Sequence, residues 1–415
     1  MKRESVYLKT QLSTLPYFDE FRKGMDLDAI DFSQETRNMI DEFFRRIHES
    51  EKQWNKNRIS ITRTLRVLKP SELNEKVKKD YKIIPSNIRK SIETTCQKLH
   101  EVCIHFHNRS YYLHICGPLS MKNTHIDSII HHTYLWLSFV NDYVDPECAQ
   151  NVNIFLFMVS NMKYVPHEHN EVIGLDHVNT AFTYSCLPNT DIYIYREEEW
   201  YRALIHETFH TLGLDFIRMG TTTIHSYEAE IKKMWPVPIP DMRIYETYCE
   251  MWAEVLNAMF YVYHENTHLF STRGRLPLRE LKRQWADCMF YERAFSVWQC
   301  TKLLAHYNIE YEYLPKRAAL YKENTQGFSY YVLKCILTVH IKHFLHFCAI
   351  QWKDRYSVQF KLNGTNLRNY CNLFTRFAHS APMTYGTRYM HNHLNSKKNT
   401  PFYKTLRMSM IQFTL

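Results

Sequence analysis

The sequence is poor in the two residues that make flexible linkers, with 9 Gly and 14 Pro in 415 residues. This scarcity excludes a collagen-like repeat, and a hydrophobic share of 45% excludes a chain that is disordered as a whole. At roughly 150 residues per domain, the length allows two or three domains. We therefore expect compact lobes with a substantial core.

The chain also lacks C-x-x-C pairs although it contains 11 Cys, and its first residues, MKRESVYLKTQL, lack the apolar core of a signal peptide. Both features favour a reducing, intracellular and cytoplasmic location. The most apolar stretch, residues 330–352, is interrupted by lysines and histidines: Lys334, His340, Lys342, His343 and His346. The sequence therefore predicts no membrane span.

Acidic residues are missing from the end of the chain. Asp354 is the last of them, and nine Lys or Arg follow between Arg355 and Leu415, which accounts for the whole net charge of +9. A basic C-terminal tail of this kind could meet an acidic protein surface, nucleic acid or anionic lipid, although no nucleic-acid-binding motif accompanies it. The alternative is an ordinary solvated surface.

The pattern of apolar residues predicts an α+β fold with four regions. They are a helical N-terminal region, a mixed sheet with the helix of the candidate site, a helical lower lobe and the basic C-terminal tail, at residues 1–100, 101–215, 216–375 and 376–415. Strands are expected near residues 102–116, 152–160 and 179–196, and a helix is expected over 124–140. Residues 380–400 lack periodicity and are predicted to be irregular.

The helix expected after residue 196 contains the motif His206-Glu-Thr-Phe-His210. Four residues advance an α-helix by roughly 400°, so both imidazoles leave one face and can bind one zinc ion. Glu207 can take a proton from a water on the metal, because zinc lowers the pKa of that water from about 15.7 to near 7. Gly213 can end the helix sharply. We predict His206 and His210 as metal ligands and Glu207 as the general base.

A catalytic zinc ion needs a third protein ligand. One route is the H-E-x-x-H-x-x-G-x-x-H pattern of metzincins, which Gly213 matches. The last position of that pattern is Phe216, which cannot bind a metal, and Asp215 is out of register by one. The sequence does not favour this route.

The better route is a second helix, IYETYCEMWAEVLNAMF, which carries Glu246, Glu250 and Glu254 at four-residue spacing beside large apolar residues. Three stacked carboxylates on a helix otherwise suited to burial repel one another, so a nearby cation would explain them. The alternative is an acidic face exposed to solvent.

The segment Glu250-Met-Trp-Ala-Glu254 resembles the E-x-x-A-D/E signature of gluzincins, the zinc metallopeptidases of the thermolysin and neprilysin type. The resemblance implies a zincin-like fold with Zn²⁺ as cofactor and Glu250 as the third ligand. It also implies that Glu254 orients His206 or His210. Glu254 stands where Asp is commoner, and Glu246 could be the ligand instead.

Residues 178–257 also resemble uncharacterised metallopeptidase-like proteins of large DNA viruses. That resemblance implies a viral protein located in a virion or a virus factory. In zincins, the strand before the active-site helix lies at the sheet edge and pairs with an extended peptide substrate. The resemblance gives this place to the hairpin expected at residues 179–196.

A second motif of the same spacing, His264-Glu-Asn-Thr-His268, is less suited to zinc, because Asn266 and Thr267 are poor residues for a helix interior. We expect His264 or His268 to end the helix that carries Glu250, where the helix dipole favours it. One of these two histidines, or Tyr261 or Tyr263, could then donate a hydrogen bond to the oxyanion of the transition state.

These features predict a zinc-dependent metalloendopeptidase-like hydrolase that acts on a peptide or protein substrate. A second hypothesis is a catalytically silent zincin-fold protein, a structural or virion component that docks through its basic C-terminal region. A third is a helical module in which the His206 motif is accidental and lies far from Glu250.

Overall fold

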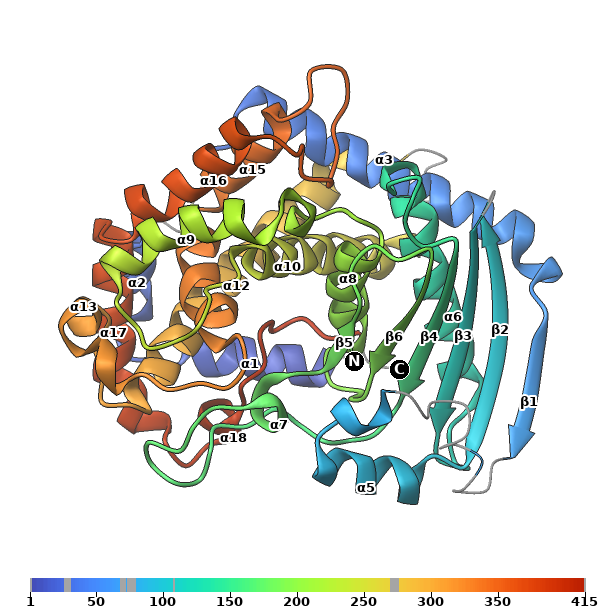
Figure 1. Cartoon of the computed structure of the whole chain (residues 1–415), viewed down its shortest axis with the longest axis horizontal. Helices are drawn as coiled ribbons and strands as arrows, with labels where there is room; N and C mark the ends of the chain where they lie inside the picture. The colour runs from blue at the N-terminus through green and yellow to red at the C-terminus, as the bar shows by residue number, and fades with distance from the viewer. Residues whose placement is uncertain are drawn as a thin grey trace. The chain divides into compact units, whose positions relative to one another are not determined.

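The computed structural model in Figure 1 describes residues 2–25, 31–67, 72, 80–106, 109–268 and 276–413. It is an α+β structure with a six-stranded mixed sheet, as the pattern of apolar residues predicts. The chain divides into two compact units. The sheet unit consists of Phe44–Lys163, Asn179–Leu214 and Gln412–Leu415, and the helical unit consists of Met1–Phe43, Tyr164–Val178 and Asp215–Ile411.

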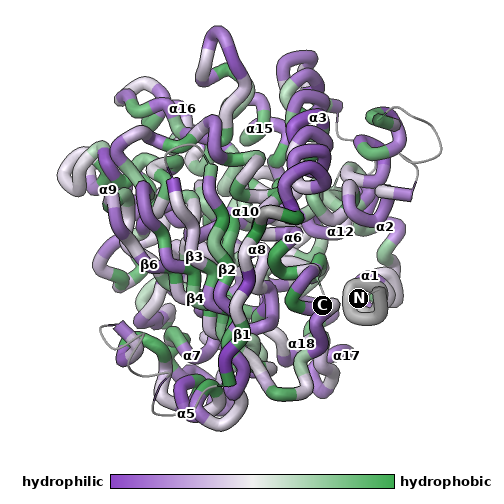
Figure 2. The backbone as a smooth tube through the Cα atoms, turned by 90° about the vertical axis from the view of Figure 1, so that its right-hand side faces the viewer, coloured by the Kyte–Doolittle hydropathy of each residue, from purple (hydrophilic) through white to green (hydrophobic). Residues whose placement is uncertain are grey.

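The boundaries of these units differ from those of the four regions expected from sequence. The predicted N-terminal region belongs to both units, because the boundary between them falls after Phe43, within α3 (Gln34–Asn57). Figure 2 shows α3 as mostly hydrophilic, and its buried side chains form one stripe: Met39, Ile40, Phe43, Phe44 and Ile47. This stripe has the three- and four-residue spacing of an amphipathic helix.

The sheet has the strand order β1-β2-β3-β4-β6-β5, which can be followed in Figure 1. The strands are β1 (Arg63–Val67), β2 (Lys98–Phe106), β3 (Arg109–Gly117), β4 (Asn151–Phe157), β5 (Ala181–Thr183) and β6 (Asn189–Ile194). β3, β4 and β6 are parallel, whereas β1, β2 and β5 each join an antiparallel pair. The expected hairpins and the buried strand near residue 152 are confirmed.

Helices cover the sheet unit's central strands. α5 (Ser86–Thr95) packs Ile88 and Ile92 into a cluster with Phe155, Phe157 and Tyr193. Because side chains alternate along a strand, the buried Ile154 and Leu156 point to the other side of β4. α6 (Asn123–Val140) contacts β2, and α8 (Trp200–Thr211) contacts β5 and β6. The predicted helix near residues 124–140 is α6.

The strand that directly precedes α8 is not the edge of the sheet. β6 pairs with β4 on one side and with β5 on the other, so the edge strand of this hairpin is β5. The expectation that the strand before the helix lies at the edge is therefore wrong for β6. The hairpin as a whole does end the sheet.

Long helices build the helical unit, in which α10 (Ile244–Glu265) and α12 (Leu278–Ala305) contact each other and α14 (Lys334–Val339). Its other longer elements are α1 (Lys2–Ser13), α2 (Phe18–Gly24), α9 (Thr221–Met234), the π-helix η7 (Phe328–Leu333), α15 (Ile341–Ile350), α16 (Gly364–Phe377) and α17 (Ala381–Lys397). Short helices in either unit are α7 (Leu175–Val178), α13 (Leu314–Arg317), α18 (Pro401–Lys404) and six 3₁₀ turns: Arg58–Ser60, Tyr81–Ile83, Asn141–Tyr143, Ile217–Met219, Tyr311–Tyr313 and Ala318–Leu320.

The prediction that residues 380–400 are irregular is wrong, because α17 occupies most of them. Ser380 caps this helix by accepting a hydrogen bond from the Met383 backbone N–H. A β-carbon at Gly386 would lie 2.3 Å from Met25 Sδ. The glycine that lowers the helix propensity of this segment therefore allows close packing.

The basic C-terminal region, as far as Ile411, is an integral part of the helical unit rather than a loose tail. Glu292 of α12 accepts hydrogen bonds from the backbone N–H groups of Met410 and Ile411, and Lys334 donates to the Met408 carbonyl at 2.7 Å. Several cations of the region are engaged: Arg388 pairs with Glu312, and Arg407 is buried. Removing this region would therefore remove core contacts.

Among the described residues, no single helix has both the length and the hydropathy of a membrane span. The segments Phe328–Val339 and Ile341–Ile350 meet those criteria only as a pair, with a bend of 86° between them.

Candidate metal centre

The motif His206-Glu-Thr-Phe-His210 lies on α8, and every residue of this helix is buried. Glu199 caps its start with a positive φ of 59° and forms buried ion pairs with Lys163 at 2.7 Å and Arg202 at 3.2 Å. Burial lowers the pKa of Lys163, and the charge of Glu199 opposes that shift. These contacts fix the first turn of the helix.

The other end of α8 is fixed by Gly213. Its φ of +67° lies in the left-handed region, and the Leu214 N–H donates to the Phe209 carbonyl at 2.9 Å. The predicted sharp end is confirmed. A β-carbon at this position would also lie 2.8 Å from Cys148 Sγ, so a side chain would not fit there without a shift.

His206 and His210 converge on one point. Their Nε2 atoms lie 3.2 Å apart, and their rings meet nearly edge to face, at 74°. Two nitrogen ligands at the usual zinc distance in a tetrahedral site lie roughly 3.3 Å apart. The two imidazoles therefore have the spacing that one tetrahedral metal ion requires.

Packing within the sheet unit holds this pair of imidazoles in place. Trp136 of α6 donates a hydrogen bond from Nε1 to Thr208 Oγ1 at 2.8 Å, and its ring stacks on Phe209. Thr208 Oγ1 in turn donates to the Leu204 and Ile205 carbonyls. A side chain on the far face of α8 is thereby locked to α6, so the rotation of the helix about its axis is set.

Glu207 is also buried, with 8% of its surface exposed. Its carbonyl accepts a hydrogen bond from Thr211 Oγ1 at 3.0 Å. A buried carboxylate is costly unless a cation, a proton or hydrogen bonds compensate its charge, and Glu207 directly follows His206 on α8.

α10 carries the second set of candidates, within the helical unit. Glu246, Glu250 and Glu254 are 8%, 3% and 1% exposed, so the alternative of an acidic face in solvent is wrong. Tyr330 donates a weak hydrogen bond to Glu246 Oε2 at 3.5 Å, and Lys334 forms a buried ion pair with Glu254. The positive charge of Lys334 thus balances the negative charge of Glu254.

The second motif does not form a second site on one helix. α10 ends at Glu265, and Asn266 is its C-cap, with its N–H bonded to the Tyr263 carbonyl at 3.1 Å. His264 is half-buried in the last turn, as predicted, whereas His268 is exposed. Burial raises the pKa of Tyr261 to about 12, helped by the charges of Glu265 and Cys288, so its hydroxyl stays protonated.

Asp215 and Cys249 are functional candidates that sequence reasoning did not select. Asp215 is 1% exposed, and its carboxylate accepts hydrogen bonds from the Ile217 N–H at 3.0 Å and from Cys249 Sγ at 3.7 Å. The only sequence signal for Asp215 was its place next to the last position of the metzincin pattern. Cys249 is buried as well, and its thiol donates to that carboxylate.

Buried His, Glu, Asp and Cys side chains of this structure could hold a metal ion. His206 and His210 belong to the sheet unit, and Glu246, Asp215 and Cys249 belong to the helical unit. Imidazole, carboxylate and thiolate are the ligand types of zinc, and the geometry alone does not fix which metal would bind.

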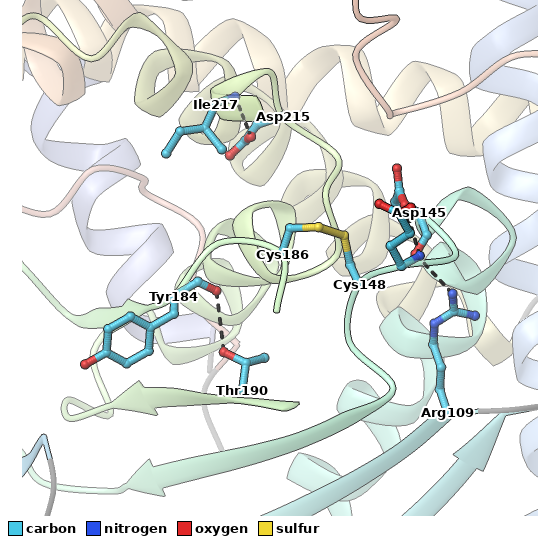
Figure 3. The surroundings of a disulfide bond; sticks show 9 residues. Arg109, Asp145, Cys148, Tyr184, Cys186, Thr190, Asp215 and Ile217 are labelled. Atoms are coloured by element: carbon cyan, nitrogen blue, oxygen red, sulfur yellow. Dashed lines mark hydrogen bonds between the residues drawn. A yellow bond between two sulfur atoms is a disulfide. The ribbon is translucent and has the colours of Figure 1, made fainter. Parts of the chain in front are cut away.

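A disulfide bond joins Cys148 and Cys186 next to the end of α8, as Figure 3 shows. The Cys186 N–H donates to the His210 carbonyl at 3.0 Å. Arg109, the first residue of β3, donates from its guanidinium to the carbonyl of Asp145, three residues before Cys148, as Figure 3 also shows. The cysteine spacing did not signal this pair, because the two residues are 38 positions apart and meet only through the fold.

Comparison of the chain with protein-family models, with curated proteins and with solved structures finds no match.

Proposed function

We propose that the chain is a zinc-dependent metallopeptidase of the gluzincin kind. The observation that carries this proposal is the separation of 3.2 Å between His206 Nε2 and His210 Nε2 on a fully buried helix, with Glu207 beside them. Two ring nitrogens at this separation can share one hydrogen bond or one metal ion, and both cannot carry a proton without repulsion.

The third ligand comes from α10 in this proposal. Glu250 occupies the ligand position of the E-x-x-A-D/E signature, and Glu246 lies one turn earlier on the same face. Both carboxylates are buried, and a divalent cation would offset their mutual repulsion. Glu254 orients one of the two histidines, and its ion pair with Lys334 keeps it ionised for that task.

In this proposal, the metal activates the water, and side chains of the protein transfer its proton and stabilise the oxyanion. A zinc ion held by these residues would act as a Lewis acid and lower the pKa of a bound water to about 7. The Glu207 carboxylate accepts the proton of the attacking water and returns it to the nitrogen of the leaving amine. His264, Tyr261 or Tyr263 donates a hydrogen bond to the developing oxyanion.

The substrate is an extended peptide that adds to the sheet at β5. This strand is the edge of the sheet, next to β6, and it contacts α8. Thr183 Oγ1 of β5 bonds to Thr211 of α8 at 3.0 Å, so the edge is tied to the helix that carries the ligands. Main-chain hydrogen bonds at such an edge give affinity with little demand on sequence.

Two variants separate metal binding from catalysis. His210→Ala is expected to lose the roughly one equivalent of zinc per chain, whereas Glu207→Gln keeps the zinc and loses peptide cleavage by about a hundredfold or more. His268→Ala is the matched control, because this exposed histidine belongs to the other His-x-x-x-His motif. Metal content by mass spectrometry and cleavage of a peptide library are the measurements. A pure protein without stoichiometric metal, or a Glu207→Gln variant that cleaves normally, contradicts the proposal.

The same experiment addresses the alternative, a catalytically silent zincin-fold protein that is a structural component of a virion or of another assembly. That alternative predicts that the native protein cleaves no peptide, with or without bound metal. Deleting the basic C-terminal region does not test it, because Glu292 and Lys334 hold that region in the core.

A further inference from the structure

A cavity in the helical unit has a strongly basic lining, and none of its lining residues belongs to the candidate metal centre. Its volume is about 370 Å³, and it opens where α14 ends, α15 begins, α16 ends and α17 begins. Its polar lining consists of Arg293, His340, Lys342, His343, Arg376 and Ser380. None of the described residues that line it is an Asp or a Glu.

The cationic groups of this cavity are positioned by defined contacts. Arg293 is buried, and its guanidinium donates from Nε and Nη2 to the Val339 carbonyl at 3.1 and 2.9 Å. Lys342 and Arg376 are exposed at the rim, on α15 and α16. A cleft lined by charges of one sign concentrates the field and attracts ions of the opposite sign.

The two imidazoles add hydrogen-bonding groups to that field. His340 Nε2 bonds to Ser380 Oγ at 2.8 Å, and Nδ1 of His343 is buried without a hydrogen-bond partner among the described residues. Burial, together with the neighbouring His343 and Arg293, lowers the pKa of His340 to about 3. An anion in the cavity would relieve this repulsion and give the imidazoles an acceptor.

The helix geometry favours an anion at the same place. α15 and α17 both begin at the cavity, at Ile341 and Ala381, with Ser380 as the N-cap of α17. Backbone N–H groups at a helix start have no partner inside the helix and attract negative charge, most often phosphate. Arginine adds a planar fork that matches phosphate oxygens.

The rest of the lining is apolar and aromatic. Phe377 stacks on His340 with a centroid distance of 4.1 Å and lies 4.4 Å from His343, and Met25 and Pro382 complete this wall. A cavity of this size is at the small end of ligand sites, which span about 300–1,000 Å³, and it exceeds what a phosphate ion alone would fill. The occupant therefore has an anionic and an apolar part.

We propose that this cavity is a binding site for a small phosphomonoester. The phosphate lies between Lys342, Arg376 and the two imidazoles, and the organic group lies against Phe377. The proposal is independent of the peptidase function, because it uses none of the residues of the candidate metal centre.

Calorimetric titration with phenyl phosphate, inorganic phosphate and phenol tests the proposal on the full chain. We expect phenyl phosphate to bind, inorganic phosphate to bind more weakly and phenol not to bind. Arg376→Gln and Lys342→Gln should each weaken phenyl phosphate binding roughly tenfold, as expected for the loss of one charge-assisted hydrogen bond. Both residues are exposed, so these variants should fold, and circular dichroism checks that they do.

Arg368→Gln is the matched control, since it removes an exposed arginine from the same helix, α16. It should leave the affinity unchanged. Two results would overturn the proposal: no binding of phenyl phosphate at millimolar concentration, or an equal loss in Arg368→Gln and Arg376→Gln. The second result would mean that the ligand responds to net charge rather than to this cavity.

Discussion

Trp136 Nε1 donates a 2.8 Å hydrogen bond to Thr208 Oγ1, and Thr208 stands between Glu207 and Phe209 on the helix that carries both histidines. The bond joins α6 to α8 inside the sheet unit. It is buried, and the same threonine hydroxyl also donates to the α8 backbone. The direction of the two imidazoles thus depends on a contact made on the opposite side of the helix.

Replacing Trp136 by Phe tests this dependence. The smaller ring keeps an aromatic side chain near Phe209 but loses the hydrogen bond, so the free energy of unfolding should fall by about 1 kcal/mol or more. We also expect weaker zinc binding, because α8 can then turn slightly about its axis. Urea unfolding and competition with a chelator measure the two effects. A variant with reduced stability and unchanged zinc affinity would show that the contact supports only the fold.

Much of this fold was predictable from local pattern. The continuous apolar run that became β4 and the periodic segment that became α6 are recognisable because each has one strong period and clear ends. α17 was missed because Gly386 and its polar neighbours weaken the helical pattern. Its stability comes from packing against Met25 and α12, which no local pattern reveals.

The candidate site was predictable in part for the same reason. His206, Glu207 and His210 lie within five residues, so helix geometry alone predicts their common face. Two other contacts could not be predicted in this way, because their residues are far apart in the sequence. Lys334 is 80 residues from Glu254, and Asp215 is 34 residues from Cys249, so only the tertiary fold brings these pairs together.

The buried pair of Glu254 and Lys334 makes a second prediction. Lys334→Met removes the counter-charge and leaves a carboxylate in the core, which should lower the free energy of unfolding by about 3–5 kcal/mol. Adding Glu254→Gln to this variant should recover part of the loss, because the uncompensated charge is then gone. Denaturant titration measures both. Equal stabilities for the single and the double variant would mean that the lost Met408 contact, rather than the charge, is responsible.

A third prediction concerns the disulfide between Cys148 and Cys186. It closes a loop of 38 residues next to the end of α8, so its loss should reduce the free energy of unfolding by about 2–4 kcal/mol. Adding a reductant to the native protein should lower its unfolding midpoint. A variant with both cysteines replaced by Ser should unfold at that lower midpoint with or without reductant. A native protein that does not respond to reductant, with two free thiols there by mass spectrometry, contradicts the bond.

Glu323 makes a prediction about pH. Burial raises its pKa to about 7 although Tyr321 and the Phe328 N–H donate hydrogen bonds to it. The folded state therefore holds a proton that the unfolded state releases near the ordinary pKa of about 4.3, so the group's contribution to stability falls as pH rises from about 4 to 7 and is constant above.

The test of Glu323 uses the difference between two proteins. Relative to native protein, Glu323→Gln should gain about 1–3 kcal/mol of stability between pH 5 and pH 7.5. Taking this difference removes the contribution of groups such as His340, whose lowered pKa gives a slope of the opposite sign below neutrality. Glu168→Gln, at an exposed site, is the control and should show no such trend. A flat difference for Glu323→Gln contradicts the raised pKa.

Diffraction data collected above and below the zinc absorption edge test the central claim most directly, since they identify and locate the metal together. We expect one anomalous peak within coordinating distance, about 2.0–2.2 Å, of His206 Nε2, His210 Nε2 and a carboxylate oxygen of Glu250 or Glu246. The carboxylate that coordinates would also decide between the two glutamates. A crystal grown with zinc that shows no peak at the two histidines, or a peak without either glutamate in reach, contradicts the account.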